Sequence, residues 1–289
     1  MKQTNTVAEA REWCAAMRRA GLSIGLVPTM GALHEGHFSL LEAARRECDR
    51  VAVSIFVNPT QFGPGEDLDR YPSSPEDDLR VCRERGADLV FVGDLEGRAG
   101  VYSPGFQTWV EVEELSRPLC GRFRQGHFRG VATVVQILLG IFRPDRAYFG
   151  LKDYQQARLI ERMARDLHAG VDVRLLPTVR DPDGLAASSR NRNLSPSDRE
   201  VALRIPRALE SVSCAFQSGE RSVSVLLEKV RANLNSVPGL EVEYVEMTDA
   251  MTLEPPGSDT IAGQGVVIAV AAQVGTGNRT RLIDNVWLH

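Results

Sequence analysis

The strongest constraint on the fold is an alternation, over the first 180 residues, of short apolar runs with segments of helical periodicity. The runs are rich in β-branched and aromatic residues, which is typical of buried strands. They cover residues 24–28, 51–57, 88–92, 146–150 and 171–178, and helices are predicted between them at 38–47, 75–85, 130–142 and 153–167. Strands that alternate with helices pair in parallel through right-handed crossovers. We therefore predict an α/β fold with a doubly wound, parallel, Rossmann-like sheet.

The pattern changes after residue 180, where the sequence Asp-Pro-Asp-Gly precedes two predicted helices, at about 197–217 and 221–235. Three strands are predicted to follow, at 241–247, 266–273 and 280–283, with surface loops at 255–257 and 275–278. Helices followed by strands are typical of an α+β arrangement. We therefore predict two domains, a Rossmann-like domain of residues 1–180 and a smaller α+β domain of residues 181–289.

Composition excludes several classes of protein. The 289 residues carry 38 acidic and 34 basic side chains, a formal net charge of −4, and a mildly acidic chain without a basic tail is poorly suited to nucleic acid. No apolar run approaches the roughly 18–20 residues that span a bilayer, and the first residues lack the apolar core of a signal peptide. The five cysteines are scattered without a C-x-x-C pair. We expect a soluble cytoplasmic protein with no nucleic-acid or membrane partner.

The turn after the first predicted strand carries the most informative motif, Met-Gly-Ala-Leu-His-Glu-Gly-His at residues 30–37. Main-chain amides and the positive dipole end of a helix favour an anion, and Gly31 and Gly36 permit close approach of a ligand. His34 and His37 share one face of the first helical turn, so their imidazoles are candidates for donating hydrogen bonds to a polyphosphate. A metal site at this pair is an alternative, which the lack of a third His or Cys nearby disfavours.

Two further turns follow predicted strands. Asn58 and Gln61 lie at the carboxyl end of the second long strand, where open α/β sheets bind ligands, although an Asn-Pro turn with a capping amide is the plain alternative. Lys152 and Asp153 begin the helix after the strand at 146–150, where Lys152 offers a positive charge to a phosphate and Asp153 suits ribose hydroxyls or a helix cap. Gln156 is expected to face the same crevice as Gln61.

Two more polar segments have both a functional and a plain interpretation. Ser188, Ser189 and Arg190 follow the predicted domain junction and offer donors to a triphosphate, although a Ser-rich loop is ordinarily a linker. The basic run at 122–131 suits carboxylate or phosphate recognition, yet a subunit contact or a solvated cap is favoured for its arginines at 122 and 129. His127 is equally compatible with a structural and a ligand-binding role.

Residues 28–40 resemble the His-x-Gly-His nucleotide loop of the pantothenate synthetase (pantoate–β-alanine ligase) family, within the nucleotidyltransferase and class I aminoacyl-tRNA synthetase superfamily. The segments at 54–62, 122–131, 149–156 and 180–191 match the family pattern in order and spacing, and residues 280–285 resemble its C-terminal strand, so the resemblance covers essentially the whole chain. Two positions depart from it. Leu151 replaces a residue that is usually Glu or another polar residue, and Ala187 replaces a larger apolar residue near adenine, which implies weaker packing on the nucleotide.

The resemblance implies an AMP-forming ligase that joins (R)-pantoate to β-alanine through a pantoyl-adenylate, with release of AMP and pyrophosphate. It also implies ATP as a substrate, Mg²⁺ held mainly by the ATP phosphates with no separate protein metal site, a homodimer, and closure of the C-terminal domain as a lid. Two alternatives remain: another nucleotidylyltransferase of the superfamily, which the neutral glutamines disfavour, and a non-catalytic synthetase-like RNA-binding module, which the net charge disfavours.

The same resemblance assigns the site residues. It implies that Gln61 and Gln156 bind pantoate, and that Asn58 and Gln61 lie near the β-alanine amine. Charge on the phosphates is stabilised by His34, His37, Lys152, Ser188, Ser189 and Arg190, and His37 is the proton donor to the departing pyrophosphate. The residues that bind ATP are Met30, Gly31, Ala32, Leu33, His34, Glu35, Gly36, His37, Gly150, Leu151, Lys152, Asp153, Val179, Ala187, Ser188, Ser189 and Arg190.

Overall fold

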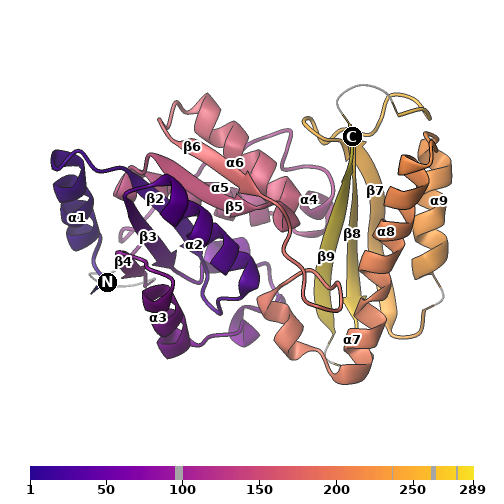
Figure 1. The fold of residues 1–289 in the computed structure, drawn as a ribbon, viewed down its shortest axis with the longest axis horizontal. Helices are drawn as coiled ribbons and strands as arrows, with labels where there is room; N and C mark the ends of the chain where they lie inside the picture. Colours follow the sequence, from indigo (N-terminus) through magenta and orange to yellow (C-terminus); the bar gives the residue numbers. More distant parts are fainter. Residues whose placement is uncertain (95–99, 236, 262–264, 278) are drawn as a thin grey trace. The chain divides into compact units, whose positions relative to one another are not determined.

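The computed structural model describes residues 1–94, 100–235, 237–261, 265–277 and 279–289. The chain forms two compact units (Figure 1). The first unit comprises Met1–Ser116, Arg124–Leu151 and Gln156–Pro177, and the second comprises Arg117–Phe123, Lys152–Gln155 and Thr178–His289. The domain limits of 1–180 and 181–289 expected from the sequence stay a prediction.

The first unit is built on a six-stranded sheet in the order β1-β4-β3-β2-β5-β6, in which every strand pair is parallel. The strands are β1 (Lys2–Thr4), β2 (Ile24–Thr29), β3 (Arg50–Ile55), β4 (Leu89–Val92), β5 (Arg146–Gly150) and β6 (Asp172–Leu176). The central strands have fully buried cores, as parallel strands covered on both faces require. The predicted doubly wound α/β fold is confirmed.

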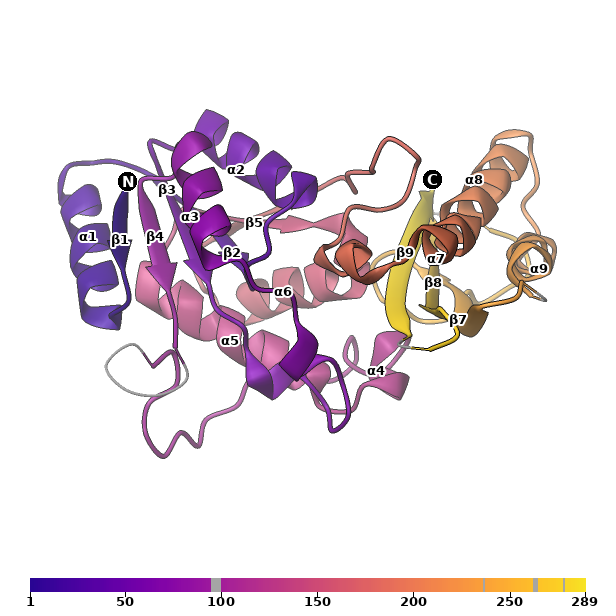
Figure 2. The same ribbon diagram turned by 90° about the horizontal axis from the view of Figure 1, so that it is seen from below.

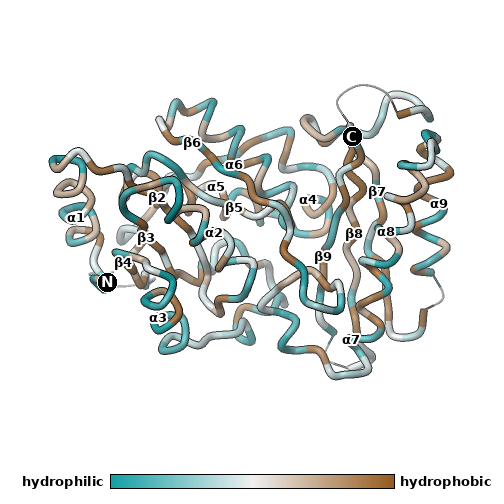
Figure 3. The backbone as a smooth tube through the Cα atoms, in the orientation of Figure 1, coloured by the Kyte–Doolittle hydropathy of each residue, from teal (hydrophilic) through white to brown (hydrophobic). Residues whose placement is uncertain are grey.

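Helices cover both faces of this sheet. They are α1 (Val7–Arg19), α2 (Glu35–Glu47), α3 (Pro75–Glu84), α5 (His127–Phe142) and α6 (Tyr154–Asp166). Figure 2 shows α2 and α3 on one face and α5 and α6 on the other. Leu41, Val53 and Cys82 belong to the apolar layer beneath α2 and α3. Most residues of α3 are hydrophilic (Figure 3). Helix α5 is buried along most of its length, as its nearly continuous apolar sequence predicted.

The strand order reverses direction between β2 and β5, which lie side by side at the middle of the sheet. In open α/β sheets the carboxyl ends of the two strands at such a switch point border the ligand crevice. The loop at 30–34 leaves β2 at this point, and Gly150 ends β5. The fold therefore places two of the sequence motifs at the expected edge of the sheet.

The second unit contains an antiparallel sheet of β7 (Leu240–Asp249), β8 (Val266–Val274) and β9 (Thr280–Leu288), in that order. Its helices are α4 (Cys120–Phe123), α7 (Pro196–Ala202), α8 (Arg204–Gln217) and α9 (Val223–Leu234). Leu209 of α8, Leu226 of α9 and Ile268 of β8 share one apolar core. The smaller α+β arrangement is thus confirmed.

Several elements differ from the sequence expectation. The helix predicted at 197–217 is divided at Leu203 into α7 and α8, because Pro206 has no N–H to donate to the carbonyl one turn earlier. Strand β9 continues to Leu288, beyond its predicted end at 283. Of the loop predicted at 275–278, Asn278 lies outside the described residues. Within the described part of the chain, no helix combines the length and apolar character needed for a membrane span.

Candidate active site

The loop between β2 and α2 is anchored by a buried carboxylate from α3. Asp78, which is 3% exposed, accepts hydrogen bonds from the N–H groups of Ala32 (2.8 Å) and Leu33 (2.7 Å). Gly31 and Ala32 have φ angles of +84° and +49°, and a Cβ at position 31 would lie 2.9 Å from Asp78 Oδ2. Position 31 therefore requires glycine, and the Asp78 carboxylate helps to hold the left-handed turn. The sequence analysis did not identify Asp78.

The two imidazoles of the motif cap the start of α2. His34 is the N-cap residue, and its Nδ1 accepts from the N–H of Gly36 (3.2 Å), while Nδ1 of His37 accepts from the N–H of His34 (3.3 Å). The ring centroids are 4.2 Å apart. Because each Nδ1 acts as an acceptor, each neutral ring carries its proton on Nε2. The cap thus fixes both histidines as Nε2–H donors.

Several main-chain amides of this loop, which the sequence analysis considered as an anion site, have partners within the chain. The amide of Gly31 donates to a threonine hydroxyl at the end of β2 (3.2 Å). The amides of Ala32 and Leu33 donate to Asp78, and those of His34 and Gly36 donate to the imidazoles. The hydrogen bonds of these amides are therefore satisfied by groups of the chain itself.

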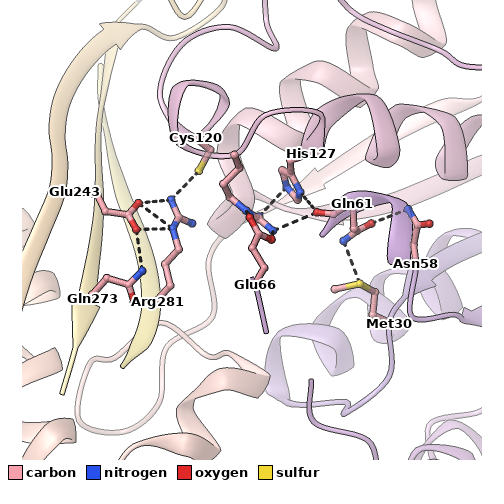
Figure 4. Close-up of polar contacts among 10 residues, drawn as sticks. Met30, Asn58, Gln61, Glu66, Cys120, His127, Glu243, Gln273 and Arg281 are labelled. Carbon is pink, nitrogen blue, oxygen red and sulfur yellow. Dashed lines mark hydrogen bonds and ion pairs between the residues drawn. The ribbon is translucent and has the colours of Figure 1, made fainter. Parts of the chain in front are cut away.

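The second motif forms the short 3₁₀ turn η1 (Pro59–Gln61) after β3. Gln61 is buried, and its side-chain amide is held at both ends (Figure 4). Its Oε1 accepts from Asn58 Nδ2 at 3.1 Å, and its Nε2 donates to Met30 Sδ at 3.1 Å. The contact with Met30 joins this turn directly to the loop after β2, as expected of two turns at one sheet edge.

The amide of Asn58 is occupied by the protein itself. Besides Gln61, its Nδ2 donates to the Gly130 carbonyl (3.2 Å), and its Oδ1 accepts from the hydroxyls of Thr60 (2.9 Å) and Tyr102 (3.0 Å). Burial raises the pKa of Tyr102, which keeps this phenol protonated as a donor. Asn58 is 1% exposed, so the structure gives it the geometry of a support for Gln61.

A buried polar chain fixes the main chain of Gln61 (Figure 4). His127 Nδ1 lies 2.7 Å from the Gln61 carbonyl, and Arg124 Nη1 lies 3.0 Å from His127 Nε2. Because Arg124 donates to Nε2, His127 is neutral and donates its Nδ1 proton to Gln61. Burial opposes the charge of Glu66, but its hydrogen bonds and ion pair with Arg124 (2.5 Å) outweigh that effect and lower its pKa. Both ring nitrogens of His127 therefore have partners within the chain, which favours the structural role of its two alternatives.

The other two arginines of the basic run also have partners within their units. Arg122 forms an ion pair with Glu246 of β7. The Arg129 guanidinium lies 4.4 Å from the ring centroid of Trp109, a cation–π geometry. The subunit contact considered for these arginines stays a prediction.

The remaining candidates of the first unit lie beside the switch strand β5. Gly150 ends β5, and Leu151 begins the 3₁₀ turn η3 (Leu151–Asp153). Gln156 is half-buried in the first turn of α6. The structure thus joins residues 30–37 with Asn58 and Gln61 by direct contacts in the first unit.

Lys152 and Asp153 belong to the second unit. Lys152 Nζ is 4.0 Å from Asp153 Oδ2, and the Lys152 carbonyl accepts from Asn285 Nδ2 of β9 at 2.9 Å. The Lys152 side chain is largely buried, with 18% exposed. The main chain beside this lysine is therefore tied to the C-terminal sheet.

The Ser-Ser-Arg segment also belongs to the second unit and begins the 3₁₀ helix η4 (Ser189–Asn193). Ser188 is its N-cap and accepts from the N–H of Arg190 at 3.3 Å, and Ser189 is buried. The N–H of Ala187 donates to the Val179 carbonyl at 2.9 Å, which joins two further candidates. The segment is thus an ordered capped turn.

An open parallel sheet with two imidazoles beside its switch point has the architecture of a ligand-binding α/β protein. Comparison with known proteins identifies the family. The sequence profile described as "Pantoate-beta-alanine ligase" matches residues 2–287. The chain belongs to the pantoate–β-alanine ligase family.

The chain is similar to individual members of this family over nearly their full lengths. The chain is 50% identical to the pantothenate synthetase of Moorella thermoacetica, with 100% of this chain and 99% of the relative covered. It is similar to the crystal structure of pantothenate synthetase from Thermus thermophilus, with a TM-score of 0.91, 45% identity and 100% of both chains covered. The ligase of Francisella tularensis, solved in complex with "Beta-gamma ATP and Beta-alanine", matches with a TM-score of 0.77 and 31% identity over 99% of this chain and 97% of that one.

Proposed function

We propose that this protein uses ATP to join (R)-pantoate to β-alanine, through a pantoyl-adenylate intermediate, and releases AMP and pyrophosphate. Membership of the family supports the reaction. The observation that carries the proposed chemistry is the capped pair His34 and His37, whose Nε2–H groups are fixed as donors beside the switch point. Two such donors suit the negative charge that grows on the phosphates during transfer.

In the first step, a carboxylate oxygen of pantoate attacks the α-phosphorus of ATP. A new P–O bond forms in line with the bond to the leaving pyrophosphate, which breaks and keeps the electron pair. Positioning and charge stabilisation dominate such a step, so no nucleophilic side chain is needed. We assign the Nε2–H of His37 to a hydrogen bond with the departing pyrophosphate, and that of His34 to a second hydrogen bond with the phosphates. The proton transfer expected of His37 would need a ring protonated on both nitrogens, which the hydrogen bond accepted at Nδ1 opposes.

In the second step, the amine of β-alanine forms a C–N bond with the acyl carbon of the adenylate. The C–O bond to the phosphate breaks, AMP leaves with the electron pair, and the nitrogen gives up a proton to water. We assign Gln61 and Gln156 to pantoate. Gln61 is the stronger assignment, because its amide is already oriented by Asn58 and Met30. Asn58, expected from the sequence near the β-alanine amine, acts through Gln61 in this proposal, because its own amide is occupied.

ATP is bound in this proposal by the residues that the family resemblance implies. Its phosphates are held by the imidazoles together with Lys152, Ser188, Ser189 and Arg190. The rest of the nucleotide is bound in this proposal by the other residues that the family resemblance implies, namely Met30, Gly31, Ala32, Leu33, Glu35, Gly36, Gly150, Leu151, Asp153, Val179 and Ala187. Closure of the C-terminal domain as a lid is part of the same proposal, because the acyl adenylate must be kept from water.

Magnesium fits this site as a companion of ATP. Among the described residues, no three His, Cys, Asp or Glu side chains are grouped to hold a metal ion. In this proposal Mg²⁺ accompanies ATP, because this ion takes phosphate oxygens and water molecules as its main ligands. When bound, the ion would neutralise charge on the phosphates, while the side chains of the protein orient the two substrates.

The proposal includes a homodimer in the cytoplasm without a nucleic-acid partner. All five cysteines are free thiols, which supports a reducing compartment. The net charge of −4 supports the absence of a nucleic-acid partner.

The test is an assay of ATP consumption in which each substrate is omitted in turn. We expect pyrophosphate release to require pantoate, and AMP release to require β-alanine as well. His37→Ala should lower pyrophosphate release by about a hundredfold or more, the usual contribution of one positioned hydrogen-bond donor to developing negative charge. Pyrophosphate release that ignores pantoate, or that needs a phosphorylated substrate instead, would overturn the proposal.

A further inference from the structure

The carboxylate of Asp78 reaches across from α3 to the loop that carries the two imidazoles. Each of its two oxygens accepts one hydrogen bond: Oδ2 accepts from the N–H of Ala32 at 2.8 Å, and Oδ1 accepts from the N–H of Leu33 at 2.7 Å. The carboxylate is buried where water cannot replace it. A pair of hydrogen bonds to one charged group is among the stronger local constraints available to a main chain.

The location of this contact gives it a functional consequence. Leu33 immediately precedes His34, the residue that caps α2 and whose amide is bound by His37. The direction in which both imidazoles point therefore depends on the main chain of residues 31–33. That main chain includes Ala32 at φ +49°. This left-handed conformation costs free energy for a residue with a side chain, so it persists only where neighbouring contacts hold it.

We propose that Asp78 is a positioning residue for ATP: it fixes the loop at 31–33 so that His34 and His37 present their Nε2–H groups to the phosphates. This inference rests on the proposed function. It adds a residue from α3 that acts through the loop and does not itself bind the nucleotide. The position of Asp78 in the first turn of α3 also suits its negative charge, because a helix N-terminus stabilises an anion.

Asparagine at position 78 tests the proposal with almost no change in volume. An asparagine keeps one acceptor oxygen, but its NH₂ group faces the second loop amide, so one hydrogen bond becomes an apposition of two donors. The matched control is Asp77→Asn, because Asp77 is the preceding residue of the same helix, is 69% exposed and pairs with Arg80 at 3.0 Å. Both variants remove one negative charge from the same helical turn.

Two measurements are made on the full-length protein. For Asp78→Asn, we expect the KM for ATP to rise at least about tenfold, the factor for one hydrogen bond to a charged group, with the KM for pantoate changed less than about twofold. Hydrogen exchange should accelerate in peptides covering residues 30–37 and stay unchanged in the antiparallel sheet. Asp77→Asn should match the unaltered protein in both measurements. A merely structural loss would instead raise both KM values and accelerate exchange throughout.

Should Asp78→Asn fail to fold, Gly31→Ala perturbs the same contact from the loop side, because its Cβ would lie 2.9 Å from Asp78 Oδ2. Equal ATP KM values for the position 78 and position 77 variants, or unchanged exchange at 30–37, would overturn the positioning role. Failure of the unaltered protein to release pyrophosphate with pantoate would overturn the proposed function instead, and the exchange comparison would still decide whether Asp78 holds the loop.

Discussion

Gln61 enters the proposed reaction with its side chain already oriented. Its Oε1 accepts from Asn58, and its Nε2 donates to the sulfur of Met30. A thioether is a weak acceptor, so a substrate oxygen can replace it with a gain in hydrogen-bond strength. Asn58 offers no comparable exchange, because its amide also binds Gly130 and Tyr102. The two amides therefore have different roles in the proposal: Gln61 binds the substrate, and Asn58 orients Gln61.

A double-mutant cycle tests this division. Asn58→Ala should raise the KM for pantoate about fivefold to tenfold, the factor for one lost hydrogen bond in a buried site. In a Gln61→Ala background the same substitution should add less than about twofold, because residues that act through one another are not additive. Steady-state kinetics of the four proteins gives the coupling.

Tyr102→Phe is the control for this cycle, because it removes one donor to Asn58 Oδ1 and leaves the contact with Gln61 in place. Its effect on pantoate should be small. Fully additive effects of Asn58→Ala and Gln61→Ala would show that Asn58 contacts the substrate independently.

The predictability of the candidate site follows from where each residue lies in the sequence. His34, His37 and Gln61 come directly after strands, so their place at the sheet edge could be predicted from periodicity alone. Asp78 could not, because an acid in the first turn of a helix is expected for the helix dipole in any case. Its partner Leu33 lies 45 residues earlier, and no local pattern records such a pairing.

At the level of elements, the predicted strands and helices between residues 24 and 176 match the observed ones closely, because each buries a continuous apolar face. Helix α1 was not predicted, since only Ala10 and Cys14 of its 13 residues are buried and its apolar stripe is narrow. Strand β1 has three residues, too few for any period to show. The division between α7 and α8 depends on Pro206, which interrupts an otherwise continuous helical pattern.

The packing of α5 against η1 gives a prediction at this scale. A Cβ on Gly130 would lie 2.4 Å from the Thr60 carbonyl oxygen and 2.8 Å from the Gln61 amide nitrogen. Gly130→Ala must therefore displace the turn that carries Gln61. We expect a loss of about 1–3 kcal/mol in the free energy of unfolding, the usual cost of overpacking, and a raised KM for pantoate.

Gly140→Ala is the matched control within the same helix, because nothing lies within 4 Å of a Cβ built at that position. It should stabilise the protein by about 0.5–1 kcal/mol, as alanine is the better helix former, and leave the KM for pantoate unchanged. Chemical denaturation and steady-state kinetics of both variants check the pair. A tolerated Gly130→Ala with unaltered pantoate kinetics would contradict the link between α5 packing and the substrate turn.

Over the whole molecule, the chain interleaves its two units. Residues 117–123 and 152–155 belong to the second unit, although the sequence on both sides of each belongs to the first. Hydrogen bonds account for this assignment: Tyr154 donates to the Ala250 carbonyl (2.7 Å), and Cys120 Sγ lies 3.1 Å from the Tyr244 hydroxyl. A sequence pattern divides a chain into contiguous stretches, so it could place only one boundary, near residue 180.

Because of this interleaving, the turn that carries Lys152 is held by a contact with the C-terminal sheet. Substitution of Asn285 in β9 tests whether that contact sets the position of Lys152. Asn285→Ala removes the donor to the Lys152 carbonyl. The kcat/KM for ATP, measured by pantoate-dependent release of pyrophosphate, should therefore fall about twofold to tenfold, the range for one neutral hydrogen bond. The control is Asn233→Ala in α9, which also removes an asparagine donor to a lysine carbonyl, that of Lys229 at 2.7 Å. Because Asn233 is exposed on a helix without a proposed role, its loss should leave ATP kinetics unaltered. Equal kinetics for the two variants would mean that β9 does not set the position of Lys152, and that the phosphate contact proposed for this lysine depends on its side chain alone.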